Sequence, residues 1–197
     1  MTDNANLAAL IGSRICHDLI SPIGAINNGL ELLTMAGETS GPEIDLIGES
    51  VGNAAARIRF FRIAFGAAGM QTVGRTEVTS ILRDLYGQSR LKVSWTPEAA
   101  QSRAAVRLAF LGLLCLESAM PYGGMIEVNE NDGAWALTGK ADKLNVSEAL
   151  WAGLSDPGNA KSVQPAHVQF ALMPAIARDE GREISVDQDD MRIVLRF

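Results

Sequence analysis

Apolar residues recur at helical spacing from Leu7 to Leu33, the first long pattern in the chain. The spacing predicts one long amphipathic helix with an apolar stripe that advances in steps of about four and three residues, as in a helix packed in a bundle or coiled coil. This stripe contains Leu19, Ile23, Ile26, Leu30 and Leu33. Pro22 lies inside the pattern and has no N–H to donate to the preceding turn, so a bend is expected just after His17.

A second heptad pattern begins after Pro42 and contains Ile44, Ile47, Val51, Ala54, Ile58, Phe61 and Phe65. Glycine and proline in segment 36–42 predict a short turn between the two helices, which then form an antiparallel hairpin. One hairpin buries only one stripe per helix, and a second copy across a two-fold axis would cover the rest. We therefore expect a homodimeric four-helix bundle. The alternative is a monomer in which the hairpin folds back on the C-terminal half.

The C-terminal half shows shorter helices and strands. Helices are expected over 76–86, 102–120, 147–154 and 165–179, and strands over 91–95, 125–129, 134–138, 184–186 and 192–195. Thr76 is expected to cap the first of these helices, and Asn131-Asp132-Gly133 is the strongest hairpin signal in the chain. Helices on one side of a mixed sheet form an α/β sandwich. The predicted fold class is therefore α+β, with a helical hairpin over 1–70, a linker over 72–75 and a sandwich over 75–197.

Composition and charge argue against several classes of function. The 197 residues carry a net charge of −6, whereas a nucleic-acid surface needs clustered lysine and arginine. The chain has no long apolar run of a membrane span, and its first residues lack the pattern of a signal peptide. Cys16 and Cys115 lie in apolar helical patterns without metal-ligand spacing. We expect reduced thiols, no metal site and a cytoplasmic protein.

His17 is the candidate reactive residue. It lies two residues before the apolar stripe begins, on the outward face, and Ser21 follows one turn later on the same side. An exposed histidine is most often only a surface residue, and Asp18 can simply pair with Arg14 one turn back. A solvent-facing histidine beside an acid and close to a proline is nevertheless hard to explain by packing.

The string His17-Asp18-Leu19-Ile20-Ser21-Pro22 resembles the H-box of two-component histidine kinases. In the C-terminal half, segments 123–128 and 181–186 resemble parts of the ATP-binding domain of these kinases. The resemblance covers nearly the whole chain in the right order. It implies that a phosphoryl group is carried on His17.

The ATP-binding motifs of active kinases are replaced in this chain. By the resemblance, Cys115 stands where the kinases carry an asparagine that binds Mg²⁺, and a thiol is a poor ligand for this hard cation. Segment 139–143 replaces the motif that binds adenine. Segment 165–171 replaces the glycine-rich motif that holds phosphates, and it cannot form the same nest of backbone amides.

This combination is similar to the ChpT-type histidine phosphotransferases of alphaproteobacteria. The resemblance implies a homodimer that takes a phosphoryl group onto His17 from the receiver domain of a hybrid kinase. The group then passes to response regulators of the CtrA and CpdR type. Asp18 would orient the imidazole or accept its proton, and Ser21 would hydrogen-bond at the site. No cofactor is expected on this chain, because Mg²⁺ would be held by the partner's receiver domain.

Four further residues are candidates for supporting roles. Counting along the hairpin places Arg62 at the height of His17, with Arg59 one turn before it. These arginines are either solvated or offset the charge of a phosphoryl group. Ile20 and Gly24, beside His17 by the heptad count, would offer a receiver an apolar surface that permits close approach.

Two other functions stay open at this point. One is an ATP-active histidine kinase with divergent motifs, which nucleotide binding would favour. The other is a non-catalytic dimerisation module that binds receivers while His17 is incidental. A phosphoryl group retained on the protein after mixing with a phosphorylated receiver would separate this second alternative from a phosphotransferase.

Overall fold

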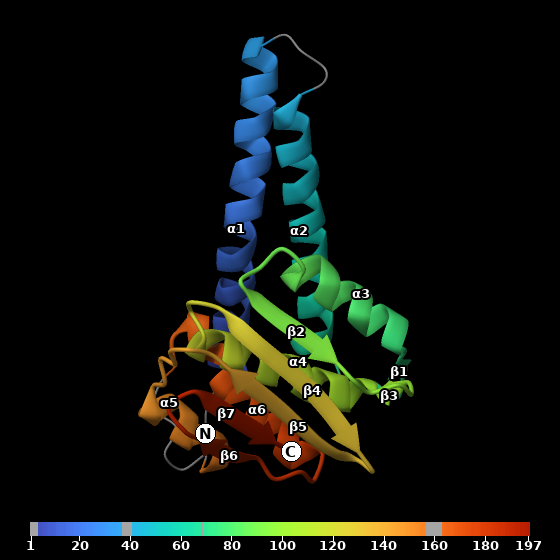
Figure 1. The fold of residues 1–197 in the computed structure, drawn as a ribbon, viewed down its shortest axis with the longest axis vertical. Helices are drawn as coiled ribbons and strands as arrows, with labels where there is room; N and C mark the ends of the chain where they lie inside the picture. The colour runs from blue at the N-terminus through green and yellow to red at the C-terminus, as the bar shows by residue number, and fades with distance from the viewer. Residues whose placement is uncertain (1–3, 37–40, 68, 157–162) are drawn as a thin grey trace.

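Two long antiparallel helices, α1 (Asn4–Ala36) and α2 (Pro42–Ala64), form a stalk that rises from the rest of the chain (Figure 1). The computed structural model describes residues 4–36, 41–67, 69–156 and 163–197. The hairpin predicted from the two heptad patterns is confirmed, although most of its expected turn falls outside the described residues. α1 continues through Pro22, which is buried on the side of the helix that faces α2.

A glycine lies in the contact between α1 and α2. Gly29 is buried, and a Cβ atom there would lie 2.6 Å from Cγ1 of Ile47, so the two helices approach closely at this point. The predicted apolar stripes are only partly used in this contact. Between 49% and 54% of the surface of four of their members stays exposed, namely Ile23, Leu30, Val51 and Ile58. The hairpin therefore leaves apolar surface uncovered, as expected for helices that need another layer.

The remaining residues form what we call the body, residues 72–197, around a five-stranded mixed sheet. Its strands are β2 (Leu91–Trp95), β4 (Gly124–Asn131), β5 (Ala134–Lys140), β6 (Ser185–Gln188) and β7 (Arg192–Arg196). The strand order is β2-β4-β5-β7-β6, and only the β2–β4 pair is parallel within it. Asp132 and Gly133 join β4 to β5 with positive φ angles of 48° and 84°, as a two-residue type I′ turn requires. The predicted hairpin is thus confirmed.

Among the described residues, the body also contains four α-helices and one 3₁₀ turn. They are α3 (Arg75–Tyr86), α4 (Arg103–Ala119), α5 (Glu148–Ser155), η2 (Pro165–His167) and α6 (Val168–Asp179). In Figure 1 the sheet lies in front of α4 and α6. The predicted α+β class, with helices packed against a mixed sheet, is confirmed.

Two local predictions are wrong. The residue that precedes α3 is Gly74 and not Thr76, which lies inside the helix. The hydroxyl of Thr79 donates to the carbonyl of Arg75 at 2.9 Å, a bond within the helix rather than a cap. The expected linker contains a short strand, β1 (Thr72–Val73), which pairs with β3 (Gln101–Ser102). Two-residue strands are too short to produce a periodic pattern, so the sequence did not indicate them.

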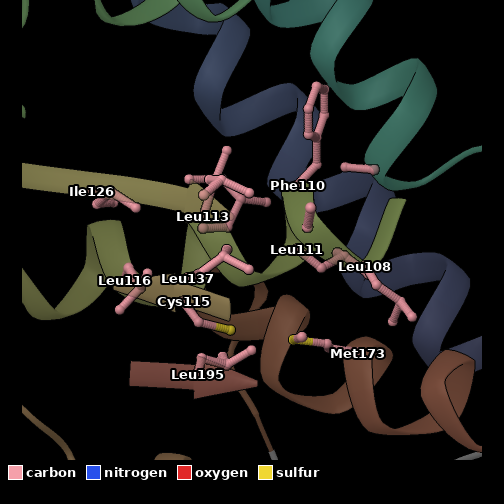
Figure 2. Packing of buried hydrophobic residues seen from close by; sticks show 14 of the residues in the cluster. Leu108, Phe110, Leu111, Leu113, Cys115, Leu116, Ile126, Leu137, Met173 and Leu195 are labelled. Carbon is pink, nitrogen blue, oxygen red and sulfur yellow. The ribbon is translucent and has the colours of Figure 1, made fainter. Parts of the chain in front are cut away.

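The largest core lies between α4 and the sheet. Figure 2 shows side chains of α4 packed among residues of β4, β5, β7 and α6. Gly112 permits this approach, because a Cβ atom there would lie 2.8 Å from Cδ2 of Leu137 and 3.7 Å from Cδ2 of Leu195. Ser102 begins α4 and its hydroxyl accepts a hydrogen bond from the N–H of Ala105 at 3.2 Å.

Gly112→Val should lower the free energy of unfolding by about 1 to 3 kcal/mol, since the added methyl groups would overlap Leu137 in a filled core. Urea denaturation monitored by circular dichroism measures this change. Gly12→Val is the matched control, because Gly12 lies on the exposed side of α1 with no atom within 4 Å of the added Cβ. Equal stability losses in the two variants would contradict the packing described for α4.

The base of the stalk belongs to the same core as the body. Phe60 of α2 stacks on Phe110 of α4 with ring centroids 4.4 Å apart. Leu7, Ile11 and Ile15 of α1 pack against this core from the other helix of the stalk. The segments predicted as two units, 1–70 and 75–197, therefore share one continuous set of buried residues. Among the described helices we find no stretch with the length and hydropathy of a membrane span.

Candidate functional site

His17 projects from α1 with 81% of its side chain exposed. Its Nδ1 atom lies 3.0 Å from Oδ1 of the neighbouring Asp18. A carboxylate in this position accepts a hydrogen bond from Nδ1–H and so favours the neutral tautomer whose lone pair is on Nε2. In this tautomer the exposed imidazole carries a free lone pair on Nε2.

The side chain of Asp18 points toward α2, and only 9% of it is exposed. Its Oδ2 atom accepts a hydrogen bond from Nε of Arg14 at 2.7 Å and lies 3.8 Å from Nη1 of Arg57 on α2. The pairing with Arg14 expected from the sequence is present, but it uses the oxygen that does not contact His17. Arg14 thus holds the carboxylate in place beside the imidazole, and the guanidinium of Arg57 lies nearby without a hydrogen bond to it.

The other residues predicted beside His17 lie on the same part of α1. Ser21 is exposed and lines a hollow of about 380 Å³ between α1 and α2, together with Asp18, Asn53 and Arg57. Ile20 is 68% exposed. Gly24 is half-buried, and an added Cβ there would meet no atom within 4 Å. The region around His17 is therefore open to the approach of a partner.

Arg59 and Arg62 lie elsewhere, in ion pairs with α3. Nη2 of Arg59 donates to Oδ2 of Asp84 at 2.6 Å, and this hydrogen bond holds the pKa of the Asp84 carboxyl below its usual value. Nη2 of Arg62 lies 3.8 Å from Oε1 of Glu77. The structure thus brings Arg57 into the cluster with His17 and Asp18, and leaves Arg59 and Arg62 in pairs with α3. Residue counting gave Arg62 for this position, whereas the helix register, with Gly29 beside Ile47, brings in Arg57, five residues earlier on α2.

A polar cavity of about 740 Å³ lies between α2, α3 and α4, and Arg57, Tyr86 and Glu117 line it. The hydroxyl of Tyr86 donates to Oε2 of Glu117 at 3.3 Å. Burial raises the pKa of the Glu117 carboxyl, and Arg57 and Arg14 oppose this effect. Burial also raises the pKa of the Tyr86 hydroxyl well above its usual value. This pair was not predicted from the sequence, although an acid in the apolar pattern of α4 was an available signal.

Comparison with known proteins supports the prediction made from the H-box. Residues 75–192, more than half of the chain, match the family model described as histidine phosphotransferase C-terminal domain. Over 195 residues the chain is 35% identical to "Protein phosphotransferase ChpT" of Brucella abortus, covering 92% of this chain and 90% of that protein. The chain belongs to the histidine phosphotransferase family. The predicted family is thereby confirmed.

The fold of this histidine phosphotransferase also matches a solved relative described as a bacterial phosphotransferase. The TM-score is 0.81 at 31% sequence identity, over 100% of this chain and 97% of the other. The two long helices and the body are included in this match, because the whole chain is covered. The phosphotransferase therefore shares the entire architecture with this relative.

In this phosphotransferase the three places that the kinase resemblance predicts to have lost ATP-binding motifs have different surroundings. Cys115 is fully buried in the core, and burial raises the pKa of its thiol well above the usual value (Figure 2). Residues 140–143 line a surface hollow of about 650 Å³ with Tyr122 and Met125. Pro165–His167 forms the 3₁₀ turn before α6. In the part of the chain that the structure describes, no three acidic, histidine or cysteine side chains are grouped to hold a metal ion.

Proposed function

We propose that His17 is the phosphoryl acceptor and carrier of a phosphorelay. The observation that carries the proposal is the exposed imidazole of His17, with Nδ1 held 3.0 Å from Asp18, in a chain of the histidine phosphotransferase family. Its donor is a phospho-aspartate on the receiver domain of a hybrid kinase. Its acceptor is the aspartate of a response regulator.

The chemical step is an in-line displacement at phosphorus. The lone pair on Nε2 of His17 forms the new N–P bond while the bond from phosphorus to the aspartyl oxygen breaks, and the receiver's aspartate leaves as a carboxylate. The proton on Nδ1 stays on the ring, which becomes positively charged. Asp18 accepts a hydrogen bond from that N–H and stabilises the charge. The reverse step delivers the phosphoryl group to the next receiver.

Most of the catalytic task is positioning. Arg14 holds Asp18, and Asp18 holds the ring, so the nucleophile is oriented before a receiver arrives. Ser21 lies one turn further along the same exposed side and is our candidate for a hydrogen bond to the phosphoryl group. No cofactor is assigned to this chain, and the Mg²⁺ of the reaction would be held by the receiver. Arg59 and Arg62 remain candidates for longer-range support of the phosphoryl charge.

The receiver would dock over Ile20 and Gly24. Ile20 is exposed and apolar, and Gly24 has open space above its Cα, so a helix of the partner can approach α1 closely. We propose response regulators of the CtrA and CpdR type as partners, on the basis of the family resemblance. The phosphotransferase would work in the cytoplasm, where Cys16 and Cys115, both free thiols, stay reduced.

A second copy of the chain would cover the exposed apolar residues of the stalk. Ile23 and Leu30 of α1, with Val51 and Ile58 of α2, each keep about half of their surface exposed in one copy. Four helices packed through these residues form a bundle of the usual kind. We therefore propose a homodimer in which each copy presents its own His17.

Transfer from a receiver tests the proposal directly. A receiver domain labelled on its aspartate with ³²P is mixed with the protein, and label should move to the protein as an acid-labile, base-stable phosphohistidine. Omission of Mg²⁺ is the matched control, because the receiver then lacks its own cation. Label that stays on the receiver for every candidate partner would overturn the proposal.

ATP should bind no more tightly than about millimolar. At the positions given by the kinase resemblance, Cys115 offers no oxygen to Mg²⁺, residues 140–142 lack the adenine-binding motif, and residues 167–169 lack glycine amides for the phosphates. Each lost contact weakens binding by roughly one or two powers of ten, at about 1.4 kcal/mol for each power. Calorimetry with Mg²⁺ and ATP measures the affinity. Micromolar binding, or label on His17 from ATP alone, would identify an active kinase instead.

A further inference from the structure

Glu117 is the only acidic residue of α4, a helix whose other members are mostly buried apolar side chains. Its carboxyl accepts a hydrogen bond from the hydroxyl of Tyr86, which is itself 4% exposed. Burial disfavours the charged form of such a group, and its pKa is raised accordingly. Packing alone does not explain an acid at this place, because an apolar residue of similar size would cost less to bury.

The cavity beside Glu117 and the hollow beside Asp18 share one cationic lining residue that can link them, Arg57. Arg57 lines the same cavity as Glu117 and Tyr86, while its Nη1 atom lies 3.8 Å from Oδ2 of Asp18. That distance exceeds a hydrogen bond, so Arg57 is not fully committed to Asp18. Arg14, by contrast, donates to the same oxygen at 2.7 Å. Two cations are thus placed between two carboxylates.

Other charged groups around Glu117 do not replace Arg57. The charged and titratable residues of the cavity are Glu49, Arg57 and Arg59 from α2, Asp84 and Tyr86 from α3, and Glu117 from α4. Arg59 is occupied by Asp84 at 2.6 Å. Nε of Arg57 donates to Asn53 at 3.0 Å, which keeps its guanidinium between α1 and the cavity. Among the described residues that line the cavity, Arg57 is therefore the cation available to balance Glu117.

We propose that Glu117 and Tyr86 are positioning residues for His17, which they influence through Arg57 and Asp18. Glu117 holds Arg57 back from Asp18, and the hydrogen bond from Tyr86 keeps the carboxylate of Glu117 in place. Oδ1 of Asp18 then remains available to Nδ1–H of His17, and the nucleophilic lone pair stays on Nε2. The inference rests on the proposed function insofar as it concerns phosphoryl transfer.

Loss of the charge on Glu117 has a definite consequence for the ring. Without the attraction of that charge, Arg57 would close on Asp18, which is already its nearer carboxylate, since paired hydrogen bonds between guanidinium and carboxylate are stronger than a contact at 3.8 Å. Arg57 would then compete with His17 for Asp18. The imidazole would lose its preferred tautomer and its fixed orientation, without any change to His17 or Asp18 themselves.

The test measures the tautomer of His17 and the rate of transfer in the full-length protein. The chain has only two histidines, so ¹⁵N-histidine labelling gives a simple NMR spectrum, which is recorded at pH 8. Glu117→Gln should raise the Nε2–H fraction of His17 and slow transfer from a phosphorylated receiver by about 3- to 30-fold, as for residues coupled at a distance. Tyr86→Phe should act in the same direction with a smaller effect.

Glu127→Gln is the matched control, because Glu127 is exposed on β4 and its replacement changes the net charge equally. This variant should keep the wild-type tautomer and rate. An unchanged His17 tautomer in both Glu117→Gln and Tyr86→Phe, with folded protein by circular dichroism, would overturn the inference. A wild-type protein that accepts no phosphoryl group would instead overturn the proposed function, and the NMR result would still stand.

Discussion

Replacing His17 with glutamine should abolish phosphoryl acceptance, lowering the label on the protein to background. The carboxamide nitrogen of glutamine has no nucleophilic lone pair, so the side chain at position 17 of the variant cannot form the bond to phosphorus. Because 81% of the His17 side chain is exposed, the free energy of unfolding should change by no more than about 0.5 kcal/mol. Label transfer from a phosphorylated receiver and urea denaturation measure the two effects.

The second histidine of the chain provides a matched control for this variant. His167→Gln removes the same chemical group from the turn before α6 and should leave transfer at the wild-type level. Acid-labile label that persists on the His17→Gln protein would show that another residue is the carrier. Loss of transfer in both variants would point to a general defect rather than to a missing nucleophile.

Changing Ile58 to aspartate should convert the proposed dimer to a monomer. Ile58 is 54% exposed in a single copy, so an aspartate there should not unfold the monomer. In a symmetric bundle the same position would be buried, and each copy would place an unpaired charge in an apolar layer. Burial of these charges would cost several kcal/mol, which exceeds the binding free energy that a moderate interface could lose and still remain dimeric. Light scattering coupled to size-exclusion chromatography measures the mass.

The choice of position matters for this experiment. Phe61 belongs to the same heptad pattern, but it is only 5% exposed and packs on Phe60 and Phe65 within one copy. Phe61→Asp would therefore unfold the protein and would not report on assembly. Met125→Asp is the matched control, since Met125 has similar exposure on the body. A wild-type protein that runs as a monomer at micromolar concentration would contradict the dimer.

The features predicted correctly from the sequence are those fixed by local patterns. The two heptad patterns predicted the helical hairpin. Asn131-Asp132-Gly133 predicted the turn between β4 and β5, where Asp132 and Gly133 have the positive φ angles that such a turn needs. The beginning of α3 was misplaced because glycine at its N-cap offers no side-chain signal. A threonine two residues later was a more conspicuous candidate.

The supporting residues of the site could not be derived in the same way. Arg57 reaches Asp18 because the contact of Gly29 with Ile47 sets the helix register, and such a tertiary contact is invisible to counting along the chain. Glu117 and Tyr86 are separated by 31 residues and meet only when α3 and α4 pack together. The reactive histidine was found because its neighbours in sequence are also its neighbours in space.

The hydrogen bond from Arg14 to the carbonyl of Ala166 joins residues 152 positions apart. During synthesis α1 leaves the ribosome first, yet the turn and helix that complete its surroundings are made among the last residues. Until then Ile11 and Ile15 have no finished core to pack against. Such non-local closure slows folding and leaves apolar surface open to aggregation. Truncation of the C-terminal end, or its slow synthesis, should therefore first disturb the packing of the N-terminal helix that carries His17.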